Sequence, residues 1–168
     1  MRLLIISISV VFAVIIQTTW LAGMNLPWLP WPVTPDLVLI VVISIGLLRG
    51  PDEGLIFGLA TGFFLDLVSG GLIGIQAASK MIAGFMIGLL EKTIFKDNLV
   101  LPTLAVFIST LVLETFHIIM YQAFNANYHL ITIFFTVILP LAFYNALLTP
   151  LIYFLILKLD RFVAERVS

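Results

Sequence analysis

The sequence contains no cysteine, and only 10% of its 168 residues are charged. The missing cysteine excludes disulfides, thiolate metal sites and cysteine nucleophiles. Soluble domains average roughly 25% charged residues, so the low charge content excludes an ordinary soluble domain. The formal net charge of −1 provides no field that would attract nucleic acid, and we expect no nucleic-acid partner. The GxxxxGK[ST] phosphate-binding loop is also absent, so active transport would require other subunits.

Apolar residues make up 62% of the chain and occur in runs long enough to span a bilayer. A transmembrane helix needs about 20 residues, so six such helices would use most of the sequence. We therefore predict an all-α, polytopic membrane protein with six transmembrane helices in one compact bundle, and no soluble domain. The predicted spans cover about residues 3–22, 36–48, 54–69, 75–90, 99–122 and 135–157. Pro140 is expected to kink the last segment, or to separate a surface helix from the sixth span.

Lysine and arginine gather on one side of the predicted spans. Seven of the eight basic residues fall on that side, none falls in the opposite loops, and Lys80 lies within the fourth span. Because basic residues favour cytoplasmic loops, we predict a multi-pass protein of the bacterial cytoplasmic membrane with both termini in the cytoplasm. The seven residues are Arg2, Arg49, Lys92, Lys96, Lys158, Arg161 and Arg166.

Two neighbouring spans carry a small or charged residue at every fourth position. Residues four apart lie on the same face of a helix, and small residues let two helix backbones approach closely in lipid. We therefore predict that these faces point into the bundle, either for packing alone or as an interaction surface. The residues are Gly54, Gly58, Gly62 and Asp66 in the third span, and Lys80, Gly84 and Gly88 in the fourth.

The ionisable residues of the spans are predicted to form an inward polar cluster. Asp66 and Lys80 each continue the glycine series of their own helix, so we predict a buried ion pair between them, with Glu114 as the rival partner of Lys80. His117 is expected to join the cluster from the outer half of the fifth span, and Asn145 from near the middle of the sixth. Such a cluster fits a proton or ion path, a solute site, a docking groove for a partner helix, or a structural network that fixes helix register. For Asp66, a position at the headgroup level is a further alternative.

Catalytic and metal chemistry find little support in the sequence. Glu114 and His117 have the Glu-x-x-His spacing of di-iron bundles, but those sites need a second copy and further glutamates. Serines such as Ser69 have no nearby His/Asp partner in the sequence. We therefore predict no metal, no cofactor and no catalytic residue.

A series of motifs between residues 35 and 88 resembles the MreD family of bacterial rod-shape proteins. Pro35-Asp36-Leu37 opens the second span and Gly50 follows it, then comes the G-x3-G-x3-G-x3-D run that ends at Asp66, and then Gly71-Leu72-x-Gly74. The resemblance implies a non-enzymatic inner-membrane scaffold of the cell-wall elongation machinery that works with MreC. It also implies wider partners, namely MreB, RodA and a class B penicillin-binding protein, and a fold similar to the S components of energy-coupling-factor transporters.

Two other functions stay open at this point. The first is a solute-binding transporter subunit similar to an S component; those proteins present an A-x3-A stripe on their first span, whereas here Ala13 is followed four residues later by Gln17. The second is an intramembrane enzyme that uses Glu114 and His117, although it lacks a nucleophile or a metal set. The face that binds partners and the formation of homo-oligomers are also left open.

Overall fold

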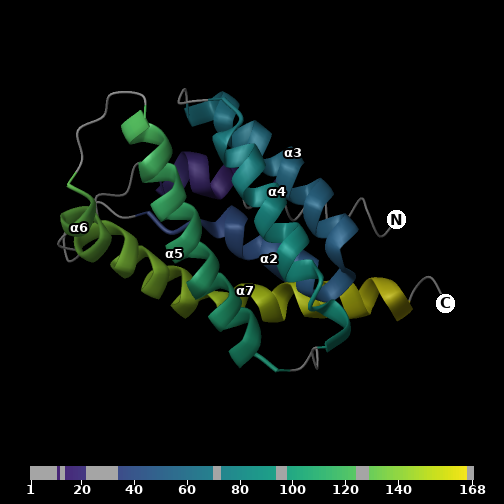
Figure 1. The fold of residues 1–168 in the computed structure, drawn as a ribbon. Helices are drawn as coiled ribbons and strands as arrows, with labels where there is room; N and C mark the ends of the chain where they lie inside the picture. Colours follow the sequence, from purple (N-terminus) through teal and green to yellow (C-terminus); the bar gives the residue numbers. More distant parts are fainter. Residues whose placement is uncertain are drawn as a thin grey trace.

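The computed structural model describes residues 11, 14–21, 34–69, 73–93, 98–123 and 129–165, and these residues form helices joined by turns (Figure 1). The first predicted span is described only at residues 11 and 14–21, and Arg2, Lys96 and Arg166 lie outside the described residues. In chain order the elements are η1 (Ile16–Leu21), α2 (Leu37–Arg49), α3 (Pro51–Ser69), α4 (Ile75–Gly88), η2 (Glu91–Thr93), α5 (Val100–Ala123), α6 (Leu130–Ile133), η3 (Phe134–Ile138) and α7 (Leu139–Glu165).

Each predicted span from the second to the sixth coincides with helix. Two helical runs, Val100–Ala123 and Leu130–Phe162, are long and apolar enough to cross a membrane, and Leu37–Arg49 is a shorter apolar helix. The last run continues through Pro140, so the structure has no break there that would set a surface helix apart. Pro140 falls in the first turn of α7, directly after the π-helical turn η3. Since proline has no N–H to donate, this wide turn is a suitable place for it.

Helix α2 forms the centre of the bundle. It is apolar on every side, and each of residues 38–48 is buried, as expected for a helix that is hydrophobic all round. It packs against α3, α4, α5 and α7 (Figure 1). Asp36 caps its start, with Oδ1 accepting a hydrogen bond of 2.8 Å from Leu39 N. Gly50 ends it with a φ of 99°, a conformation that favours glycine.

Helices α3 and α4 form an antiparallel pair in backbone contact. A Cβ atom built on Gly54, Gly58 or Gly62 would lie under 3.0 Å from backbone atoms of α4. The register is fixed by these contacts, because Gly54 meets Gly84, Gly58 meets Lys80, and Gly62 meets residues 76–77. The predicted close approach along the glycine faces is confirmed, and these faces lie inside the fold.

One end of the bundle is tied together by Arg49, the last residue of α2. Its Nη2 lies 2.6 Å from Asp160 Oδ1 of α7, and its Nη1 lies 3.2 Å from Glu53 Oε2 of α3. At the same end, Gly88 of α4 packs against Pro51. The charged ends of α2, α3 and α7 therefore meet on the side that the basic residues predict to be cytoplasmic.

Candidate functional site

A lysine buried inside the bundle is the centre of the candidate site. Lys80 of α4 is only 1% exposed, and its Nζ lies 2.7 Å from Asp36 Oδ2 at the start of α2. The same ammonium donates a 2.7 Å hydrogen bond to Gln76 Oε1, one helical turn earlier. A buried charge is expensive unless it is paired and hydrogen bonded, and both conditions are met here.

The predicted ion pair between Asp66 and Lys80 is wrong. The glycine contacts place Lys80 opposite Gly58, which is two helical turns before Asp66 on α3. The two charges therefore do not reach the same level of the bundle, and Lys80 turns towards α2 instead. The rival pairing of Lys80 with Glu114 is also wrong, because the partner of the Lys80 ammonium is Asp36.

Asp66 closes the turn between α3 and α4. Its carboxylate is 2% exposed and accepts three backbone hydrogen bonds, from Gly74 N at 2.9 Å and from Gln76 N and Ala77 N at 3.0 Å. The first N–H groups of a helix have no partner within the helix, and a negative charge there also interacts favourably with the helix dipole. Asp66 thus caps α4 from the end of the preceding helix.

Asn145 connects α7 to α2 and α5. It is fully buried, its Oδ1 accepts a 2.9 Å hydrogen bond from Asp36 N, and its Nδ2 donates a 3.1 Å hydrogen bond to Thr110 Oγ1 of α5. The structure therefore brings Asn145 and Lys80 together through Asp36, as the inward cluster predicted for both residues requires.

Several members of this cluster were not predicted from the sequence, among them Asp36, Gln17, Gln76 and Thr110. Asp36 was expected only to open the second span, and Gln17 was noted only for interrupting an A-x3-A stripe. Gln17 Oε1 accepts a 2.9 Å hydrogen bond from Val38 N in the first turn of α2. The common signal of Asp36 and Gln17 is a polar group beside the start of an entirely apolar helix, whose first N–H groups need acceptors.

Glu114 and His117 form a second polar group with Ser79, a residue that was not predicted to belong to a site. His117 Nε2 lies 2.8 Å from Ser79 Oγ of α4, and His117 Nδ1 lies 3.6 Å from Glu114 Oε1. The order resembles a nucleophile, base and acid. However, Ser79 is 2% exposed and its hydroxyl also donates to Ile75 O at 2.5 Å. In this geometry the Ser79 hydroxyl donates its proton to the backbone of α4. The contact between Ser79 and His117 therefore links α4 to α5.

The buried polar atoms of the described chain satisfy one another. No buried side-chain nitrogen or oxygen among them lacks a hydrogen-bond partner. Across residues 34–69, 73–93, 98–123 and 129–165, no three His, Asp or Glu side chains gather as a metal site would require. The contacts around Lys80 and Asp36 join five segments, namely the N-terminal segment with Gln17, α2, α4, α5 and α7. This arrangement suits a network that holds these segments in one register.

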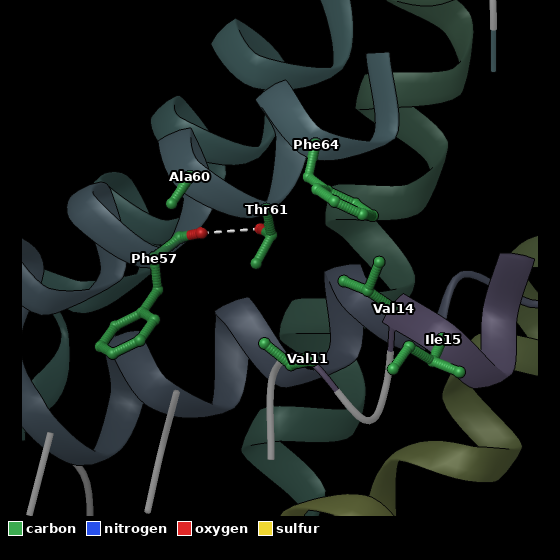
Figure 2. A pocket seen from close by; sticks show the side chains of 7 residues that line it. All are labelled: Val11, Val14, Ile15, Phe57, Ala60, Thr61 and Phe64. Carbon is green, nitrogen blue, oxygen red and sulfur yellow. Dashed lines mark hydrogen bonds between the residues drawn. The ribbon is translucent and has the colours of Figure 1, made fainter. Parts of the chain in front are cut away.

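A separate apolar cavity of about 320 Å³ lies between the N-terminal helical segment and α3 (Figure 2). Its one hydroxyl, Thr61 Oγ1, donates to Phe57 O at 2.6 Å and offers no free donor. None of the residues of the Lys80 network contributes to this cavity. The lining residues are Val11, Val14, Ile15, Phe57, Ala60, Thr61 and Phe64.

Comparison with known proteins identifies the family of the chain. No curated protein and no solved structure matches the sequence. The expected similarity to energy-coupling-factor S components therefore stays a prediction. A family model described as rod shape-determining protein MreD matches residues 1–163, which is nearly the whole chain. This match shows that the chain belongs to the MreD family, whose members are membrane proteins that determine cell shape.

Proposed function

We propose that this chain is a non-enzymatic scaffold of the cell-wall elongation machinery, embedded in the bacterial cytoplasmic membrane. Family membership supports a role in rod-shape determination. We further propose that it binds MreC directly and works with the wider group of MreB, RodA and a class B penicillin-binding protein. A scaffold needs rigid surfaces more than it needs a reaction centre, and the described part of the chain offers such surfaces.

The observation that carries the proposal is the closed network around Lys80. Its ammonium binds Asp36 and Gln76, and Asn145 binds Asp36 and Thr110, so each of these groups is already paired within the chain. A solute site would need polar groups directed at the solute. Paired groups that join the four helices α2, α4, α5 and α7 favour the structural role over solute binding.

We propose that the chain crosses the membrane six times with both termini in the cytoplasm. Four basic residues at one end of the bundle support this arrangement. Arg49 ends α2 and pairs with Asp160, and Lys158 and Arg161 lie beside Asp160 in the last turns of α7. Lys92 follows α4, whose Gly88 packs against Pro51 at the same end. Helices α3 and α4 use their glycine faces on each other, so partner proteins would bind other faces of the bundle.

Depletion in a rod-shaped host tests the proposed function. We expect round, swollen cells with normal uptake of vitamins, and co-purification of MreC from native membranes. Normal rods combined with a vitamin requirement would overturn the scaffold proposal, and recovery of a pair of ATPases would favour the transporter alternative. The variant Lys80→Met serves as a control. Its ability to restore rod shape should fall in proportion to the amount of folded protein that is lost, because Lys80 has a structural role.

A further inference from the structure

The outward face of the α3–α4 pair is apolar but short. Large apolar side chains cover it, and each of the following is at least 44% exposed: Ile56, Leu59, Phe63 and Phe64 on α3, and Ile82 and Met86 on α4. Polar residues bound this face, with exposed Asp52 and Ser69 near the two ends of α3, and exposed Lys92 after α4. The face is therefore suited to lipid over a limited height.

The rise of an α-helix gives an upper limit for the height of this apolar face. Asp52 and Ser69 both lie in α3 and are 17 residues apart. At about 1.5 Å per residue, they are about 26 Å apart along the helix. Helix α4 is shorter, with 14 residues from Ile75 to Gly88, and the exposed apolar residues after it end at Leu90. Helix tilt can only shorten the height across the membrane. The hydrocarbon core of a typical bilayer is about 30 Å thick, so this side of the protein is too short for it.

The exposed apolar face of α5 is longer than that of the α3–α4 pair. Its exposed apolar side chains extend from Val100 to Tyr121, which is 21 residues or about 32 Å. The α3–α4 pair cannot lengthen by sliding, because its glycine contacts and the Asp66 hydrogen bonds fix its register. One side of the bundle thus fits an ordinary bilayer and the other side does not.

We infer that the α3–α4 face is an interaction surface for thinned bilayer or short-chain lipid, so that the protein imposes a step in membrane thickness around itself. The inference rests on the six-span arrangement proposed above. Mismatch between helix length and bilayer thickness costs a fraction of a kcal/mol per ångström. Lipids with shorter acyl chains would relieve this cost at α3–α4 but not at α5.

The absence of cysteine allows a direct test in the full-length chain. A fluorophore is attached to a single cysteine, either Ile82→Cys on α4 or Ile108→Cys on α5. The two positions are matched, since they are 53% and 57% exposed and each lies eight residues from the cytoplasmic limit of its apolar face. Quenching is then measured in vesicles that contain brominated phosphatidylcholine of short or long chain length.

We expect short-chain lipid to be preferred over long-chain lipid by roughly twofold or more at position 82, with no such preference at position 108. The variant Asp52→Leu, Ser69→Leu, Lys92→Leu lengthens the face and should abolish the preference at position 82. Equal preferences at the two quenched positions would overturn the inference and leave the scaffold function untouched. Quenching at position 108 but not at position 82 would remove α3–α4 from the lipid and overturn the six-span arrangement as well.

Discussion

Lys80 and Asp36 form an ion pair of 2.7 Å across 44 residues of sequence, with the lysine fully enclosed by the bundle. The pair joins the middle of α4 to the residue that caps the start of α2. It therefore couples the α3–α4 pair to the central helix α2.

The first prediction concerns the charges of this pair. Asp36→Asn keeps a capping side chain but leaves the Lys80 ammonium unpaired, and Lys80→Met does the reverse. Removing one partner of a buried pair typically costs about 3–5 kcal/mol. We expect each single variant to lose stability in mixed-micelle unfolding, and the double variant to lose clearly less than their sum. Additive losses would contradict the pairing; Asp66→Asn with Lys80→Met is the matched control and should be additive.

The second prediction concerns Asn145. Asn145→Leu leaves both Asp36 N and Thr110 Oγ1 without this partner, and an unsatisfied buried group costs about 1–3 kcal/mol. Thr110→Val removes only the second contact, so we expect a smaller loss of about 1 kcal/mol. The same unfolding measurement ranks the two variants. A larger loss for Thr110→Val would mean that the amide of Asn145 does not hold α2.

The third prediction concerns the backbone contact of α3 with α4. Gly58→Leu or Gly62→Leu inserts a side chain where backbone atoms already meet, and overpacking commonly costs about 1–3 kcal/mol. We expect less folded protein when each variant is extracted from membranes in detergent and measured by size-exclusion chromatography. Ala60→Leu, on the exposed side of the same helix, should be tolerated. Stable and active glycine variants would show that the two helices can separate.

The fourth prediction concerns Asp66. Asp66→Ala removes the acceptor of three N–H groups at the start of α4, and loss of a cap typically costs about 0.5–2 kcal/mol. Asp66→Asn retains one acceptor oxygen and should recover part of that stability. Thermal unfolding in lipid nanodiscs checks the order of the three proteins. Equal stability of Asp66→Ala and the unmodified chain would leave the buried carboxylate without a structural role.

The fifth prediction concerns topology. A reporter that is active only in the periplasm should be silent when fused after Ser168, and a cytoplasmic reporter should be active there, because the basic residues favour a cytoplasmic side. The reverse pattern would contradict the six-span arrangement.

The sequence was sufficient to predict the faces of the helices but not their relative heights. A spacing of four residues correctly indicated that Gly58 and Lys80 face inward, since that depends on the helix repeat alone. It could not give the register between α3 and α4, which depends on where the glycine backbones come into contact. The pairing of Asp66 with Lys80 failed for that reason.

Contacts between distant segments were also out of reach. The bond from Asp36 N to Asn145 spans 109 residues, and no periodicity relates the two positions. Ser79 was missed because a hydroxyl beside His117 follows from the packing of α4 on α5, which a single sequence does not define. Asn145 itself was predicted correctly to lie inside, because an amide in the middle of an apolar span rarely faces lipid.

The central position of α2 has a consequence for biogenesis. Its two ends are fastened by Asn145 and Asp160, which the ribosome adds 109 and 111 residues after Asp36 and Arg49. Until α7 is made, the backbone N–H of Asp36 and the Arg49 guanidinium lack these partners. The side of α2 that packs on α7 is also uncovered until then. The native arrangement of α2 is therefore completed only after α7 has been made, and until then the newly made helix would depend on temporary cover from lipid or from the insertion machinery.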